Sequence, residues 1–311
     1  MKAIERPARV QWFTELSNRL GVRLDPTLNL LAEVKIEESQ FQGMRNATLR
    51  YIRACLGNPV DVTSEQALLE MAGNKLANRT PNGVLFAKRE FQVEFNHLHK
   101  VMAAWLRGAG ADDLFYQICC PLVVRLVKGE RDLKEESRPY SSTKLHSDIW
   151  TGEPSDFIGI RIPVLGDLEQ TSIAFYHPPD DFEERYQRLL TDYDEGKELE
   201  ARSVKYPATL RHGHAYFVDG TLLHRTVKNG GVARVTIQIE LRRPTPDVER
   251  REIERLCALG RLSHYIDRDE WYQYGTVKFM RFKDTYADAL RETFSKRPAE
   301  EPTYEVVASL S

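Results

Sequence analysis

The stretch ARVTIQIEL, residues 233–241, alternates strictly between apolar and polar side chains. Such alternation predicts a strand with one apolar face. The opposite face carries a cation, a hydroxyl and an amide: Arg234, Thr236 and Gln238. FIGIRIPV (157–164) repeats the pattern, with isoleucine at every second position and Arg161 on the polar face. We therefore expect a sheet whose apolar outer face needs a cover and whose polar inner face is suited to chemistry.

Other short β-forming runs, separated by turn signals, flank this strand along the chain. They are LVVRLV (122–127), TSIAFY (171–176), HAYFVDG (214–220) and TLLHRTV (221–227). This spacing favours an antiparallel sandwich or barrel.

Helical patterns dominate residues 8 to about 108. Ser64 has the position of an N-cap, and the amphipathic stretch 86–108 ends at a glycine. These helices would cover the apolar face of the sheet. Residues 248–260 and 283–294 also have helical patterns, and 296–311 has the composition of a loosely held tail.

We therefore predict one integrated α+β domain with a mainly β core. A helical N-terminal layer (1–110) would pack on the core (111–243), and a C-terminal helical extension (244–311) would follow, with a possible homodimer contact there.

The composition is that of an ordinary soluble globular protein of 311 residues, with 41% hydrophobic and 29% charged residues. A formal net charge of −2 gives no sign of the basic surface that binds nucleic acid. No apolar run approaches the roughly 18 residues of a membrane span, so a cytoplasmic location is the default expectation. The four cysteines lack C-x-x-C spacing and are expected to be reduced and structural: Cys55, Cys119, Cys120 and Cys257.

Two separate motifs supply candidate metal ligands. SSTKLHSDIW (141–150) contains His146-x-Asp148, and HRTVKNGGVARVT (224–236) begins with His224. Two imidazoles and one carboxylate on one face of a metal are the ligand set typical of non-haem Fe(II) oxygenases. Three coordination positions stay open, two for a chelating cosubstrate and one for O2.

Charge counting extends this interpretation. A doubly charged Fe(II), the Asp148 carboxylate and a 2-oxoglutarate dianion leave one net negative charge, which is costly to bury unpaired. Arg234 can supply the missing cation, because a planar guanidinium meets a carboxylate with two parallel hydrogen bonds. Thr236 can add a hydroxyl from the same face.

The turn Asn229-Gly230-Gly231 predicts how these residues meet. If it closes a three-residue hairpin loop, His224 lies opposite Thr236 and Arg234 is its diagonal neighbour, roughly 7–8 Å away on the same face.

The combination of His146-x-Asp148, a distal His224 and Arg234-x-Thr236 resembles the Fe(II)/2-oxoglutarate-dependent oxygenases with a double-stranded β-helix (jelly-roll, cupin-like) fold. The resemblance covers roughly residues 117–242. Within it, LHSDIWTGEPSDF and the following IPV look like the streptomycin-biosynthesis type found in carbohydrate and aminoglycoside gene clusters.

The resemblance implies that His146, Asp148 and His224 bind iron, and that Arg234 and Thr236 hold the distal carboxylate of 2-oxoglutarate. It implies oxidative decarboxylation of that cosubstrate to succinate with O2, and hydroxylation or other C–H oxidation of a sugar, nucleotide-sugar or other polar natural product. No motif marks the residue that binds the C1 carboxylate of 2-oxoglutarate. Arg125, Thr143 and Gln238 are candidates because strand alternation places them on the polar face.

Several residues have two interpretations. Arg161 either forms a salt bridge or anchors an anionic substrate group, and Trp150 either packs in the core or stacks on a substrate ring. The acidic insertion 180–205 is either a surface helix or a lid.

Two histidine pairs compete weakly with the triad. His97-x-His99 is expected to be a helix surface pair that cannot chelate jointly, because its members point about 200° apart. His212-Gly213-His214 is expected to form a turn. The alternative function is a redox-neutral, metal-dependent cupin-like sugar isomerase or hydrolase, which has no need for Arg234.

Overall fold

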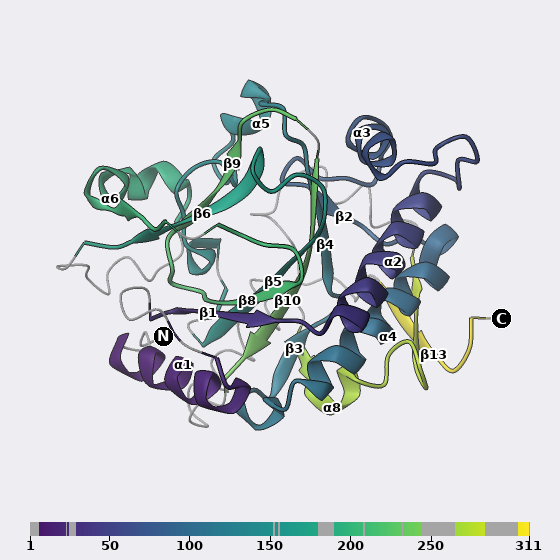
Figure 1. The fold of residues 1–311 in the computed structure, drawn as a ribbon, viewed down its shortest axis with the longest axis horizontal. Coiled ribbons are helices and arrows are strands. Elements are labelled where there is room, and N and C mark those ends of the chain that lie inside the picture. Colours follow the sequence, from purple (N-terminus) through teal and green to yellow (C-terminus); the bar gives the residue numbers. More distant parts are fainter. Residues whose placement is uncertain are drawn as a thin grey trace.

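The computed structural model combines helices with antiparallel sheets (Figure 1). It describes residues 6–22, 24, 29–151, 153–154, 156–179, 190–207, 209–231, 233–243, 265–283 and 304–310. Among these, no helix is long and apolar enough to cross a membrane.

An eight-stranded sheet forms the centre of the fold, in the order β1-β8-β5-β10-β3-β11, with β4 pairing both β10 and β2. Its strands are β1 (Leu31–Lys35), β2 (Val84–Leu85), β3 (Gln117–Cys119), β4 (Val123–Val127), β5 (Phe157–Leu165), β8 (His214–Asp219), β10 (Arg234–Arg242) and β11 (Tyr265–Asp267). The predicted strands at 122–127, 157–164, 214–220 and 233–241 are confirmed to within one or two residues at each end.

Helices cover the apolar face of this sheet, as expected from the alternation. They are α1 (Arg6–Leu20), α2 (Glu38–Cys55), α3 (Glu65–Lys75) and α4 (Gln92–Gly108). Ile160 and Ile237 have no exposed surface and belong to the same cluster as Met44 of α2 and Met102 of α4. Ser64 caps α3, because its hydroxyl accepts a hydrogen bond from the Ala67 amide at 3.1 Å.

A three-stranded sheet of β7 (Val204–Lys205), β6 (Thr171–His177) and β9 (His224–Lys228) faces the other side of the large sheet. Phe175 of β6 packs in one cluster with Tyr216 and Val218 of β8. Figure 1 shows β6 and β9 on the side away from α2 and α4. The space between the two sheets therefore receives the polar side chains of β5 and β10.

The expectation of helices throughout residues 8–108 is wrong at β1 and β2. Leu31 pairs with Val218 and Lys35 with His214, so this segment completes the edge of the large sheet. Five residues are too short for a periodic pattern to be recognised, and only the free edge of β8 selects the strand.

The predicted hairpin between β9 and β10 is also wrong. β9 pairs with β6, whereas β10 pairs with β4 and β5, so His224 and Thr236 are not partners. Gly230 and Gly231 have φ values of 97° and 76°, which glycine adopts readily. With these angles the chain leaves one sheet and enters the other.

The C-terminal region also differs from the expectation. Tyr304 is buried, and β13 (Tyr304–Val307) pairs with β12 (Phe279–Phe282), so this part of the predicted loose tail is an ordered strand. Residues 248–260 and 284–294 of the predicted helices lie outside the described residues. The remaining short elements are η1 (Arg89–Phe91), η2 (Asp112–Leu114), α5 (Leu133–Glu136), η3 (Asp148–Thr151), η5 (Tyr193–Gly196), α6 (Lys197–Arg202) and α8 (Arg268–Trp271).

Candidate functional site

The two predicted histidine ligands lie directly opposite each other in an antiparallel β-bridge. The His146 amide donates to the His224 carbonyl at 2.9 Å, and the His224 amide donates back at 2.8 Å. Directly opposed residues project their side chains to the same face. The imidazole rings accordingly lie side by side, with centroids 4.4 Å apart.

Asp148 completes the cluster from the first position of η3. Its Oδ1 is 3.6 Å from His224 Nε2, and one ligand atom from each of the three residues lies within 4.8 Å of the others. This is the only group of three metal-ligating side chains found among the described residues. Two imidazoles and a carboxylate at this spacing fit a six-coordinate metal with an open face.

Backbone carbonyls set the tautomer of both histidines. His146 Nδ1 is 2.8 Å from the Lys144 carbonyl, and His224 Nδ1 is 2.9 Å from that of Leu222. A carbonyl oxygen only accepts hydrogen bonds, so each Nδ1 carries the proton and each Nε2 is left for a metal. Burial lowers the pKa of His224 and lowers that of His146 to about 3, so both rings are neutral.

Arg161 holds the other oxygen of the carboxylate. Its Nη2 donates to Asp148 Oδ2 at 2.8 Å, so the structure contains the salt bridge that was one of its two interpretations. Burial acts to raise the pKa of Asp148, but Arg161 and the two histidines outweigh burial and lower it. The carboxylate is therefore ionised and ready to bind a cation.

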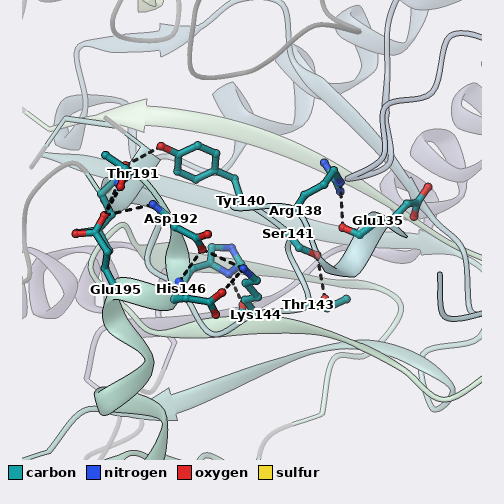
Figure 2. Close-up of polar contacts among 12 residues, drawn as sticks. Glu135, Arg138, Tyr140, Ser141, Thr143, Lys144, His146, Thr191, Asp192 and Glu195 are labelled. Atoms are coloured by element: carbon teal, nitrogen blue, oxygen red, sulfur yellow. Dashed lines mark hydrogen bonds and ion pairs between the residues drawn. The ribbon is translucent and has the colours of Figure 1, made fainter. Parts of the chain in front are cut away.

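The C-terminal part of the predicted acidic insertion packs on the outer side of this centre. The Tyr193 ring stacks on the His146 ring, with centroids 4.4 Å apart and planes 13° from parallel. Lys144 donates to Asp192 Oδ1 at 3.0 Å, and both residues are labelled in Figure 2. Lys144 also donates to Asp194 Oδ2 at 2.6 Å. Residues 190–196 thus hold the chain that leads into His146, and no local pattern signals this.

Residues 190–202 belong to the C-terminal part of the predicted insertion. Tyr140 donates its hydroxyl to the Leu190 carbonyl at 2.7 Å. The capping box of η5 joins Asp192 to Glu195, both of which Figure 2 labels. This part forms a packed wall beside the ligands. Residues 180–189 lie outside the described residues, so the lid interpretation stays a prediction.

The polar face of β10 presents the predicted cosubstrate residues. Arg234 is 1% exposed and donates from Nη1 to Thr236 Oγ1 at 3.0 Å. Thr236 lies opposite Arg125 of β4 and Pro163 of β5. Among the described residues, Arg234 Nε, Arg125 Nε and Gln238 Oε1 are buried without a hydrogen-bond partner.

These cations repel one another in the structure. Burial, followed by repulsion from Arg125 and Arg161, lowers the pKa of Arg234 to about 9. Burial and then Arg161 lower the pKa of Arg125. Unpartnered guanidinium donors with depressed pKa values gain from an anion, so this face fits a dicarboxylate.

Glu240 lies on the same polar face of β10, but it was not among the candidate residues predicted from the sequence. It follows Arg234, Thr236 and Gln238 at the same two-residue interval, so strand alternation alone would have found it. Burial raises its pKa, although Arg161 and Arg125 oppose the effect.

Two candidate residues lie elsewhere. The Thr143 hydroxyl is 2.9 Å from that of Ser141, and its proposed cosubstrate contact has no independent support. Trp150 has no exposed surface and packs with Tyr193 and Gly196, where a Cβ would lie 2.3 Å from the indole. Trp150 therefore packs in the core, which was one of its two interpretations, and its contact with a substrate ring stays a prediction.

The competing histidines do not form a second metal site. His99 is fully buried and its Nε2 lies 3.0 Å from the Trp271 carbonyl, so His97-x-His99 is not a surface pair. The predicted turn at 212–214 is confirmed, with Gly213 at a φ of 75°. The described cysteines are free, and Cys119 and Cys120 are buried; Cys257 lies outside the described residues.

Comparison with known proteins gives distant likenesses only. No family model matches the chain, and no curated protein sequence is significantly similar. Among solved structures, the non-heme α-ketoglutarate dependent carbocyclase SnoK from nogalamycin biosynthesis is 12% identical, covers 81% of this chain and 91% of its own, and gives a TM-score of 0.41.

Two further structures are similarly distant in sequence and in fold. EctD from S. alaskensis, solved with 2-oxoglutarate and 5-hydroxyectoine, is 14% identical over 70% of this chain and 74% of its own, with a TM-score of 0.39. AviO1 from Streptomyces viridochromogenes Tue57 is 15% identical over 79% of this chain and 98% of its own, with a TM-score of 0.37. At these values the likenesses assign no ligand or activity to this chain.

Proposed function

We propose that this chain is an Fe(II)- and 2-oxoglutarate-dependent oxygenase on a double-stranded β-helix, which oxidises a C–H bond of a small polar substrate. The observation that carries the proposal is the convergence of His146, Asp148 and His224, with ligand atoms within 4.8 Å of one another. The guanidinium of Arg161 connects Asp148 to the polar face of the large sheet, on which Arg234 also lies.

In this proposal His146 and His224 bind iron through Nε2, and Asp148 binds through Oδ1. Arg234 and Thr236 hold the distal carboxylate of 2-oxoglutarate, and Arg125 or Gln238 contacts the C1 carboxylate. When bound, iron would bring O2 to the site as the oxidant; two of its four oxidising equivalents would convert 2-oxoglutarate to succinate and CO2, and the other two would oxidise the substrate C–H bond. Arg234 offsets the negative charge that remains on the loaded centre, and Arg125 and Arg161 add further positive charge on this face.

The substrate belongs to the sugars, nucleotide-sugars or other polar natural products in this proposal, and the resemblance of LHSDIWTGEPSDF to the streptomycin-biosynthesis type is its support. Hydroxylation is the outcome we expect first. The same ligand set can also serve desaturation, cyclisation or epimerisation, so product analysis must accompany any assay.

The experiment that tests the function measures succinate formed from 2-oxoglutarate by the purified chain with Fe(II) and O2, across a panel of sugars and nucleotide-sugars. Anaerobic addition of Fe(II) and 2-oxoglutarate should produce a visible charge-transfer absorption that neither produces alone. A chain that binds metal but never consumes 2-oxoglutarate would favour the redox-neutral sugar isomerase or hydrolase.

A further inference from the structure

Arg161 lies on the inner face of β5, opposite Gln238 of β10 and Tyr216 of β8. Its side chain is 6% exposed, and Nη2 donates to Asp148 Oδ2 at 2.8 Å. Nη1 is buried and has no hydrogen-bond partner among the described residues. The guanidinium therefore binds Asp148 through Nη2, and its Nη1 is not held by another residue in the described part of the chain.

This contact makes the two oxygens of Asp148 unequal. Oδ2 is engaged by Arg161, whereas Oδ1 lies 3.6 Å from His224 Nε2, on the side where the ligand atoms converge. Asp148 lies in a four-residue turn outside the ladders of both sheets. The orientation of its carboxylate consequently depends on this side-chain contact.

Gly159 provides the space that the guanidinium occupies. Residues 159 and 161 share one face of β5, and a Cβ at position 159 would lie 2.5 Å from Arg161 Nη1 and 2.9 Å from Nη2. The clash involves the end of a flexible side chain, and the backbone of Gly159 is not in the left-handed region. A methyl group there would displace the guanidinium while leaving every charge in place.

We propose that Arg161 is a positioning residue that restricts Asp148 to one-oxygen metal coordination, and that Gly159 is required for this placement. The inference rests on the proposed metal site. It differs from a role in anchoring substrate, because Arg161 acts here through a metal ligand. Residues of this kind typically contribute about 10–100-fold to metal affinity.

The test uses the full chain with Gly159→Ala, Arg161→Met and Arg161→Lys. Mn(II) affinity is measured by calorimetry without cosubstrate, and the Co(II) ligand-field spectrum reports the coordination number. We expect affinity to fall about 10–100-fold in Gly159→Ala and Arg161→Met. Arg161→Lys should recover part of it, and the Co(II) spectrum should change in the two weaker variants.

Arg225→Met is the matched control. Arg225 adjoins His224 in sequence but pairs with Glu200, so its loss should leave Mn(II) affinity unchanged. Thermal unfolding without metal separates misfolding from ligand misplacement, and Gly159→Ala retains both charges if Arg161→Met fails to fold. Unchanged Mn(II) affinity and Co(II) spectrum in folded Gly159→Ala and Arg161→Met would overturn the role of Arg161. A wild-type chain that binds no Mn(II) would instead overturn the proposed function, and this inference with it.

Discussion

The large sheet and the triad region hold their functional residues in different ways. On the large sheet, Arg125, Thr236 and Arg161 occupy positions in continuous strand ladders. In the triad region, His146 and His224 meet in one isolated bridge, and Asp148 lies in a short turn. The ladders orient the first group through the backbone. In the second group only His224 belongs to a ladder, that of β6 and β9, and the Asp148 carboxylate is held by the Arg161 side chain.

The two regions should differ in how sensitive they are to substitution. The pleat of a strand sets which face a residue occupies, so cations on the large sheet keep their face without further support. The ligands depend on groups that surround them, above all the Tyr193 ring, the backbone carbonyl of Lys144 and the Arg161 guanidinium. Changes outside the ligand set should therefore affect metal binding more on the triad side than on the sheet side.

The largest effect is expected from His224→Ala, which removes a ligand. Metal affinity should fall by more than about 100-fold, because even residues that only orient ligands contribute up to that much. Calorimetric titration with Mn(II) and a succinate assay measure the loss. Arg225→Ala, one position along the strand, is the control and should retain both properties.

Arg234→Ala tests the sheet side. Removing one partner of a buried charge pair costs about 2–5 kcal/mol, so KM for 2-oxoglutarate should rise by about 30- to 4,000-fold. Mn(II) affinity should change little, because Arg234 is hydrogen-bonded to Thr236 rather than to a ligand. Equal loss of metal binding would contradict the separation of the two regions. Arg234→Lys should restore only part of the affinity, since lysine lacks the planar fork.

Tyr193→Ala tests the wall beside His146. Removing a buried aromatic ring costs about 3–5 kcal/mol of folding free energy, and it also removes the surface on which the imidazole rests. We expect a lower unfolding midpoint in urea and about tenfold weaker Mn(II) binding. Tyr193→Phe keeps the ring and should bind Mn(II) like the wild type. If both variants bind equally well, the stack has no part in holding His146.

Acid should destabilise the metal-free chain through its buried histidines. Burial lowers the pKa of His146 to about 3 and that of His99 to about 4, from an ordinary value of 6.5. Between these values the unfolded chain binds protons that the folded chain does not, so stability is lost as pH falls below 6.5. Each histidine should contribute a loss of about 1–2 kcal/mol by about pH 5.

The pH effect can be divided between the triad region and the helical layer by urea unfolding across this pH range. His99 lies in the helical layer, so His99→Gln should reduce the slope of stability against pH in that interval. Saturating Mn(II) should raise the stability of the same variant, because it binds the folded triad. A slope that His99→Gln leaves unchanged would exclude His99 as a source of the acid loss.

The smallest effect is expected from Lys144→Met. Its ammonium pairs with two aspartates that are 35% and 56% exposed, and such partly solvated pairs contribute less than about 1 kcal/mol. The Lys144 carbonyl that orients His146 is retained. Unfolding and Mn(II) titration should both stay near wild-type values, and a large loss of metal binding would show that the ion pairs are needed.

Much of this site could be predicted from local patterns. Alternation correctly assigned Arg161, Arg234, Thr236 and Gln238 to one side of the large sheet, and residue chemistry selected the three metal ligands that the fold brings together. Tyr193 could not be predicted, because a stack between residues 47 positions apart leaves no periodic signal. The prediction of a hairpin between β9 and β10 was wrong, because a glycine turn that joins two sheets has the same sequence pattern as one that closes a hairpin.

Local sequence is enough to tell which side chains can bind a metal and an anion and which face of each strand they occupy, since strand periodicity is a local property. The pairing of His224 with His146 rather than with Thr236 follows from the packing of distant segments. Strand pairing depends on hydrogen bonds between distant segments. Just after β9, the strand that carries His224, Gly230 and Gly231 let the chain pass from the small sheet to the large one.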